Sequence, residues 1–413
     1  MFSTATQELL KNTLSVLPTL VMEKELRHDI DELVASVLPA VKLSVVDDVN
    51  TSTAYGERVF RALKGRFPCT HITLKDTPVA DDHAVQYLRT QTLSADALVA
   101  VGSGTVSDLC KYVAHLDRKP YVVFPTAASM NGYLSANASI TVRGHKKTML
   151  AMMPLAAFCD LTVIADAPVR LNKSGLGDSL ARSTAQADWL LSHLLLDTHY
   201  DDTPFQLVTP IEPELFDHAG GVAKNNIKSL ELLMKTLLLS GLGMTISGGS
   251  YPASQSEHMI AHAHEMFFLC AADVLSPTHR TLHGEQIGVT TLTMAALQEK
   301  LLHKKPKLRA NDFSTEQMIS LAGSDVAAQA RKAFDGKYAL IEHSSATDAL
   351  KRWESIAAQL EPVMVAQKTL MHVLQAAGAP TDCTALKWNA KDYALSVEFA
   401  RYTRERFTFL DLV

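Results

Sequence analysis

Three histidines occur within a short segment of the chain, "SQSEHMIAHAHEMF" (residues 254–267). In a helix, residues i and i+4 share one face, so His258 and His262 would point the same way and His264 would point away. Paired imidazoles on one helix face suit a metal site or a catalytic site. A chain with 16 histidines also produces clusters by chance. Both interpretations are open until other residues are considered.

Two further segments supply possible partners for these histidines. His283 lies in "TLHGEQIGV" (281–289), and Asp178 lies in "SGLGDSLARSTA" (174–185). One carboxylate and two imidazoles, with a coordination position left open, form a catalytic ligand set for Zn²⁺ or a similar divalent ion. Asp178, His258 and His283 make up that set. Taken alone, Asp178 is most simply explained as the N-cap of the helix that follows it.

A possible phosphate-binding turn lies in "VAVGSGTVSD" (99–108), where an apolar strand leads into Gly102 and Gly104 and a helix opens. Glycines there let backbone N–H groups and a helix N-terminus approach a phosphate. The third glycine of the G-x-G-x-x-G pattern is missing, so a plain strand-to-helix turn is the alternative. Asp47 and Asp48 end another strand, where an acidic residue either binds an adenosine ribose or simply caps a turn.

Hydroxyl-bearing and small residues gather in "FPTAASMNGYLS" (124–135). Thr126, Ser129 and Ser135 are possible hydrogen-bond donors there. The small side chains would let a flat ring lie against the backbone, although an ordinary tight loop has the same composition.

A scaffold must hold these residues in place, and the hydrophobic pattern of the chain predicts a scaffold that consists of two domains. Short β-branched runs such as "KLSVVDD", "THITL", "ALVAVGSG" and "YVVFPT" alternate with helical patterns, which predicts a parallel sheet covered by helices. The segment "ASITVRGHKKTML" predicts a hairpin that turns at Gly144. We expect an α/β dinucleotide-binding domain over residues 1–168, with a helical lead-in over 1–40. A helical metal- and substrate-binding domain is expected over 169–413.

The composition narrows the class of protein. Of 413 residues, 47% are hydrophobic and 20% charged, and the net charge of −5 gives no reason to expect nucleic acid as a partner. The five scattered cysteines form no C-x-x-C pair, which favours a reducing cytoplasm. No membrane span or signal peptide is predicted. The Leu- and Met-rich helices offer surface for a homodimer or a higher homo-oligomer.

Five motifs occur in one order: "VGSGTVSDLCKY", "PTAAS", "GLGD", "PASQSEHMIAH" and "HGEQIGV". In order and spacing they resemble the sn-glycerol-1-phosphate dehydrogenases. These belong to the superfamily of iron-type alcohol dehydrogenase, glycerol dehydrogenase and, more distantly, dehydroquinate synthase. The resemblance runs from "VVDD" to "RYTRERFTFLDLV". It implies an N-terminal dinucleotide-binding α/β domain, a helical C-terminal domain and an active site between them.

The resemblance also implies roles for individual residues. Asp178, His258 and His283 would bind the metal, with Asp178 also near the substrate, and His262 would contact substrate or nicotinamide and act in catalysis. Asp48 would meet the adenosine ribose. Gly102, Ser103, Gly104, Thr105 and Val106 would hold the pyrophosphate of the cofactor. Thr126, Ala127, Ala128, Ser129 and Ser135 would line its nicotinamide side. His264 has no role in the family that we can assign, and we expect it to be a structural or an exposed histidine.

Two positions depart from the pattern of the family. Asn131 stands where the family has an aspartate that contacts substrate, and an amide carries no charge. Tyr251 stands where the family often has an arginine, which removes one cation that could bind a substrate phosphate. Lys146 and Lys147 are candidates to replace that cation, although a solvated basic pair is the simpler interpretation.

The activity expected is metal-assisted transfer of hydride from NADH or NADPH to the carbonyl of dihydroxyacetone phosphate, giving sn-glycerol 1-phosphate. Asp48 would repel a 2′-phosphate and so favours NAD. Zinc is favoured over nickel or iron. The alternatives are a polyol or alcohol dehydrogenase with another substrate, a cyclase like dehydroquinate synthase, and a non-catalytic binding protein on the same fold.

Overall fold

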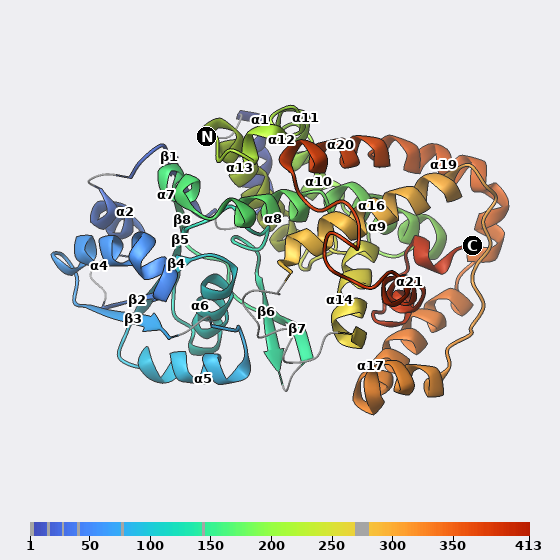
Figure 1. The fold of residues 1–413 in the computed structure, drawn as a ribbon, viewed down its shortest axis with the longest axis horizontal. Coiled ribbons are helices and arrows are strands. Elements are labelled where there is room, and N and C mark those ends of the chain that lie inside the picture. The colour runs from blue at the N-terminus through green and yellow to red at the C-terminus, as the bar shows by residue number, and fades with distance from the viewer. Residues whose placement is uncertain are drawn as a thin grey trace. The chain divides into compact units, whose positions relative to one another are not determined.

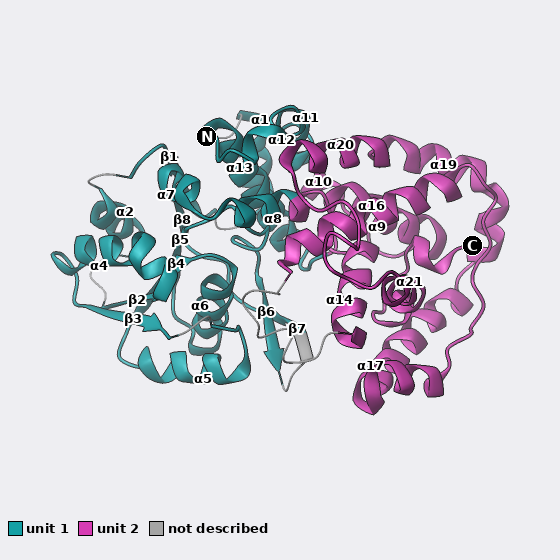
Figure 2. Ribbon diagram, viewed as in Figure 1, with its two compact units in different colours: residues 1–176, 206–250 teal, residues 177–205, 251–413 magenta. Residues whose placement is uncertain are grey.

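The structure is a computed structural model that describes residues 4–14, 17–26, 29–38, 42–75, 78–142, 145–268 and 281–413. The chain divides into two compact units (Figure 2). Unit 1 comprises residues 1–176 and 206–250, and unit 2 comprises residues 177–205 and 251–413.

Unit 1 is built on a parallel sheet that has six strands in the described part of the chain (Figure 1). In the order of the sheet these are β1 (Thr19–Glu23), β8 (Ala156–Asp160), β5 (Tyr121–Pro125), β4 (Ala97–Gly102), β2 (Leu43–Asp48) and β3 (Cys69–Leu74). The predicted alternation of strands and helices is therefore confirmed. The predicted hairpin is also present, as β6 (Asn137–Val142) paired antiparallel with β7 (His145–Leu150), whereas its expected turn residue Gly144 lies outside the described residues.

Both faces of the sheet are covered, as expected for parallel strands with apolar side chains on either face. Alternate residues such as Val45, Val99 and Phe158 face α2 (Ile30–Val37) and α4 (Glu57–Lys64) in one hydrophobic core. On the other face, α6 (Gly104–Asp117) packs against β4, β5 and β2. The helices cover the faces of the sheet, so the loops that follow the central strands lie at the carboxyl ends of those strands.

The other helices of unit 1 include a long apolar one, α13 (Ile227–Ile246). By length and composition α13 could cross a membrane, but most of it is buried inside the protein, as in the core helix of a globular protein. The remaining elements are α1 (Thr4–Thr13), α3 (Val49–Thr51), the π-helix η1 (Ser52–Gly56), α5 (Asp82–Gln91), α7 (Leu161–Asp166), α11 (Glu212–Asp217) and α12 (Ala219–Val222).

The regular elements in the described residues of unit 2 are helices, apart from an isolated β-bridge between Leu308 and Leu412. Its hydrophobic core is formed by side chains such as Leu191, Met259, Phe334 and Trp353. Its elements are α9 (Arg182–Leu196), α14 (Ser256–Phe268), α16 (His283–Leu302), α17 (Thr315–His343), α18 (Ala346–Ala349), η2 (Leu350–Arg352), α19 (Trp353–Leu360), η3 (Glu361–Val363), α20 (Gln367–Ala377), α21 (Ala390–Phe399), η4 (Ala400–Tyr402) and η5 (Phe409–Asp411). The chain passes between the units within α8 (Val169–Ser179), within α10 (Thr203–Val208) and again between Ser250 and Tyr251.

The structure corrects two expectations about organisation. The lead-in over residues 1–40 is not wholly helical, because β1 pairs with β8 at the edge of the sheet. Pro18 precedes β1, and proline cannot continue a helix, so the apolar run that follows is free to pair as a strand. The helical part after residue 168 is also not one unit, since residues 206–250 belong to unit 1, where α13 packs on α7.

Candidate active site

Three side chains that could hold a metal ion come together in unit 2: Asp178 from the last turn of α8, His258 from α14 and His283 from the start of α16. The two histidine Nε2 atoms lie 3.3 Å apart. Asp178 Oδ1 lies 3.9 Å from Nε2 of His258 and 3.8 Å from Nε2 of His283. Ligand atoms about 2.1 Å from an ion in tetrahedral geometry are about 3.4 Å from one another. This triangle therefore fits a divalent ion and leaves a fourth coordination position open.

Asp178 reaches this position because glycines allow α8 to pack tightly. A Cβ on Gly175 would lie 1.8 Å from the backbone oxygen of Ala128, and a Cβ on Gly177 would lie 2.2 Å from that of Gly284. Asp178 is not an N-cap, which corrects that interpretation. It lies inside α8, whereas the N-cap of α9 is Ala181, which makes no side-chain cap hydrogen bond.

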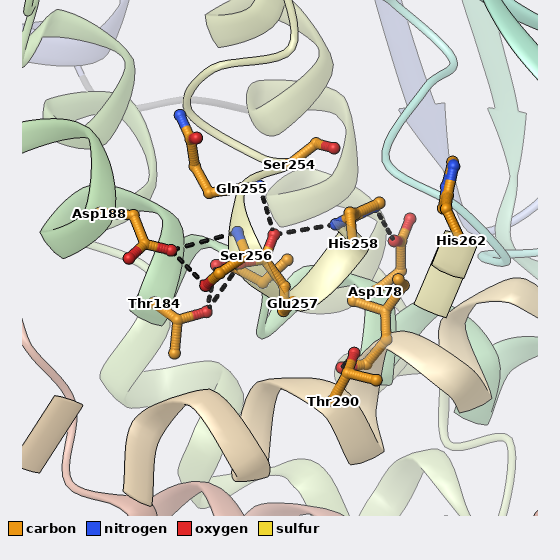
Figure 3. A network of polar contacts seen from close by, with 12 residues as sticks. Asp178, Thr184, Asp188, Ser254, Gln255, Ser256, Glu257, His258, His262 and Thr290 are labelled. Carbon is orange, nitrogen blue, oxygen red and sulfur yellow. Dashed lines mark hydrogen bonds and ion pairs between the residues drawn. The ribbon is translucent and has the colours of Figure 1, made fainter. Parts of the chain in front are cut away.

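His258 is held in one orientation by its neighbour Glu257, which is fully buried (Figure 3). Nδ1 of His258 lies 2.9 Å from Oε1 of Glu257, and the same carboxylate accepts from the Gln255 amide at 2.7 Å and from Thr184 Oγ1 at 3.1 Å. Burial alone would raise the pKa of Glu257, but the hydrogen bond and charge of His258 outweigh it and lower that pKa. An ionised carboxylate only accepts, so Nδ1 carries the proton and Nε2 presents its lone pair to a metal.

A second buried carboxylate, Asp188, anchors the beginning of α14. Its Oδ2 accepts from the amide and hydroxyl of Ser256, and its Oδ1 accepts from the Phe409 amide at 2.9 Å. Burial, followed by the charge of Glu257, raises the pKa of Asp188 to about 7. Sequence reasoning did not assign Glu257 or Asp188. The position of Glu257 directly before a ligand histidine was a usable signal, whereas the partners of Asp188 are distant in sequence.

His262 and His264 lie on different faces of α14, as predicted. The ring of His262 lies 6.0 Å from that of His258 and 5.9 Å from that of His283, between centroids. His264 points elsewhere: it stacks on Trp388 at 3.9 Å, and its Nδ1 lies 3.0 Å from Ser396 Oγ. The structural role expected for His264 is confirmed.

The predicted phosphate-binding turn lies at the carboxyl edge of the sheet in unit 1. Gly102 ends β4 in register with Pro125 of β5, and the Thr126 amide donates to the Gly102 oxygen at 3.2 Å. A Cβ on Gly102 would lie 2.6 Å from Cβ of Val106, so glycine is required for the helix to begin there. Ser103 precedes the first turn of α6, whose backbone N–H groups point out of the helix end. Adjacent strands thus bring together the residues expected to bind pyrophosphate and nicotinamide.

Three other predicted residues of unit 1 have contacts of their own. Asp48 caps α3, accepting from the amides of Asn50 and Thr51 at 2.9 Å each. Ser135 Oγ is bound to the Gly132 and Asn137 oxygens and to Nζ of the buried Lys111. Asn131 is half-buried in the loop after β5. Their roles toward ribose, nicotinamide and substrate stay predictions. Lys147 is exposed on β7, and the side chain of Lys146 lies outside the described residues.

Comparison with known proteins identifies the class to which this fold and site belong. Residues 21–168 match the family of the iron-containing alcohol dehydrogenases. The crystal structure of glycerol dehydrogenase from Schizosaccharomyces pombe shares the fold, with a TM-score of 0.56 at 19% identity, covering 84% of this chain and 92% of that one. The chain has the fold of the iron-type alcohol dehydrogenases.

Relatives with higher sequence identity show which family within this class the chain belongs to. The glycerol-1-phosphate dehydrogenase [NAD(P)+] of Halalkalibacterium halodurans is 32% identical over 304 residues, which cover 72% of this chain and 71% of that protein. The glycerol-1-phosphate dehydrogenase [NAD(P)+] of Thermococcus sibiricus is 31% identical over 277 residues, covering 66% of this chain and 76% of that protein. The chain belongs to the glycerol-1-phosphate dehydrogenase family.

Proposed function

We propose that this protein reduces dihydroxyacetone phosphate to sn-glycerol 1-phosphate, with NADH or NADPH as the reductant and one divalent ion per chain. The ligand triangle of Asp178, His258 and His283 carries this proposal, because it fits an ion with one position open to substrate. Membership of the glycerol-1-phosphate dehydrogenase family supports the choice of reaction.

Two residues of unit 2, His262 and Arg404, explain how the product oxygen would receive its proton. When bound, a divalent ion supplies positive charge to the developing oxyanion, and the nicotinamide supplies the hydride. Nη2 of Arg404 lies 3.5 Å from Nδ1 of His262. A guanidinium only donates, so Nδ1 accepts and the ring proton resides on Nε2. In this tautomer His262 is a proton donor, and we assign it the protonation of the product oxygen.

The finer assignments rest on separate observations. Asp48 at the end of β2 favours NADH over NADPH, because its charge repels a 2′-phosphate. A two-histidine, one-aspartate set with an open position favours zinc. Cys69, Cys110, Cys159 and Cys383 are free thiols, which supports a cytoplasmic location.

The test is loss of NADH absorbance by metal-reconstituted protein, offered dihydroxyacetone phosphate or unphosphorylated dihydroxyacetone. Asp178→Ala and a chelator-treated sample should be inactive, and the Asp178→Ala protein should hold no stoichiometric metal. Asp166→Ala, at an exposed carboxylate, is the matched control and should behave as the parent. Preference for the unphosphorylated ketone would assign the protein to polyol oxidation instead, which the residues Asn131 and Tyr251 would then explain.

A further inference from the structure

A fully buried lysine, Lys111, lies on α6 beyond the proposed phosphate-binding turn. Its Nζ donates to the Gly132 oxygen, to the Asn137 oxygen at 3.0 Å and to Ser135 Oγ at 3.2 Å. Asp108, one turn earlier on α6, places its Oδ1 3.4 Å from the same nitrogen. An ammonium group has three donors and no acceptor, so these oxygen neighbours match a charged lysine.

Burying this lysine is costly, which suggests that its hydrogen bonds have a purpose. Burial lowers the pKa of Lys111, and the charge of Asp108 acts in the opposite direction. Lysine is almost never fully buried unless it is paired, because its charge loses the solvation of water. Elsewhere α6 fills buried positions with apolar side chains such as Leu109 and Val113. The polar group of Lys111 therefore serves the oxygens that surround it.

Those oxygens belong to one segment of the chain, residues 132–137, which connects β5 to β6. Asp108 binds the next part of the chain, because its Oδ2 accepts from the Ser139 amide at 3.1 Å. Positions i and i+3 share one face of a helix, so Asp108 and Lys111 together attach the segment and the start of β6 to a single face of α6.

The Ser135 hydroxyl is directed into this network. Ser135 is 2% exposed, and its Oγ lies 3.0 Å from the Gly132 oxygen and 2.9 Å from the Asn137 oxygen. The ammonium of Lys111 donates to Oγ, and the single hydroxyl hydrogen is used on one of the two carbonyl oxygens. Ser135 therefore helps to fix the backbone of the segment.

The segment lies beside the proposed phosphate-binding turn. A Cβ on Gly104 would lie 3.2 Å from Sδ of Met130, and a Cβ on Gly132 would lie 3.3 Å from the same sulfur, so Met130 packs against both. In the sheet, β4 has β2 on one side and β5 on the other. With Asp48 at the end of β2 proposed to bind the adenosine ribose, the nicotinamide half of the cofactor would extend over the end of β5.

We propose that Lys111 is a positioning residue for the nicotinamide side of the cofactor-binding site. Its hydrogen bonds hold the segment 132–137 in place before the cofactor arrives, so that binding does not have to order the segment. The inference rests on the proposed function, because it concerns the same cofactor. Ser135, which was expected to line the nicotinamide, acts here as one of the acceptors through which Lys111 holds the segment.

Titrations with NADH and with ADP-ribose, which lacks the nicotinamide ring, test this role. Lys111→Met should weaken NADH binding about tenfold or more, because a loose segment has to be ordered on binding. ADP-ribose should bind as it does to the parent. Lys111→Gln keeps two donors and should be intermediate. Lys119→Met is the matched control, since Lys119 donates to the Thr92 and Leu93 oxygens, and it should bind both nucleotides as the parent does.

Hydrogen exchange tests the position of the segment without any cofactor. Amides of residues 132–137 should exchange at least about tenfold faster in Lys111→Met, or in Lys111→Gln if the first variant does not fold, while β2 and β3 keep the rates of the parent. A parent that binds NADH but does not reduce dihydroxyacetone phosphate would refute the proposed function alone. Equal losses of NADH and ADP-ribose affinity, or unchanged exchange in residues 132–137, would overturn the positioning role of Lys111.

Discussion

Nδ1 of His258 and Oε1 of Glu257 lie 2.9 Å apart in a buried environment, so one carboxylate determines which ring nitrogen faces the metal position. The two residues are adjacent in the chain, and only His258 is a proposed metal ligand. Removing the partner that orients a ligand histidine typically weakens metal binding without removing any ligand.

Glu257→Gln should lower metal affinity about 10- to 100-fold, because the amide no longer holds the His258 proton on Nδ1. Competition with a coloured chelator measures this directly. Glu342→Gln, which removes an exposed carboxylate from α17, should leave the affinity as in the parent. Unchanged metal affinity in Glu257→Gln would show that His258 needs no orienting partner.

His262→Asn should lower kcat for ketone reduction about 10²- to 10⁴-fold, the range for loss of a positioned proton donor. The metal content should stay stoichiometric, because His262 does not belong to the ligand triangle of Asp178, His258 and His283. Steady-state kinetics and metal analysis on one preparation check both expectations. A kcat equal to that of the parent would mean that solvent supplies the proton.

Gly177→Ala should destabilise the protein by about 1–3 kcal/mol or more, because its Cβ would lie 2.2 Å from the backbone oxygen of Gly284. The strain falls beside two of the proposed metal ligands, Asp178 and His283, so metal affinity should fall as well. Urea unfolding and metal titration are the measurements. Gly65→Ala is the control, since nothing lies within 4 Å of the Cβ it would add, and it should be neutral or slightly stabilising.

His264 should make stability depend on pH. Burial lowers its pKa from 6.5 to about 4, so between these values the unfolded chain binds a proton that the folded chain does not. Neutral His264 therefore contributes fully to the free energy of unfolding above its pKa in the unfolded chain. This contribution is lost as the pH falls, and the loss is about 2 kcal/mol near pH 5.

The His264→Phe variant retains a ring against Trp388 and should lose less stability than the parent between neutral pH and about pH 5. Urea unfolding at both values measures the difference. His303→Gln, at an exposed histidine, should follow the parent. Identical pH profiles for the parent and His264→Phe would mean that His264 is protonated in the folded protein.

Local sequence patterns predicted the features that depend on local geometry. Helical periodicity was enough to place His258 and His262 on one face and His264 on another, because the spacing of a helix is fixed. The glycines at positions 102 and 104 and the apolar runs likewise predicted the β4–α6 turn and the parallel sheet.

The features that sequence patterns missed depend on contacts between distant residues. Asp178 was open to interpretation as a cap because nothing nearby in sequence shows that Gly175 and Gly177 pack against the backbones of Ala128 and Gly284. Arg404 reaches His262 across 142 residues, and no periodic pattern connects them. Strand β1 was missed because a short apolar run does not by itself show whether it is a strand or part of a helix. Its pairing with the distant strand β8 decides the matter.

The hydrogen bonds of Asp188 have a consequence for the timing of synthesis. Its carboxylate joins Ser256, at the start of the helix that carries His258, to Phe409, which is 221 residues further along the chain than Asp188. At about 5–20 residues per second, a ribosome needs roughly 10–45 s to cover that distance. All three proposed metal ligands have then been synthesised before Phe409 is available to bind Asp188. An ion that binds early therefore meets a site in which Asp188 is not yet fully held.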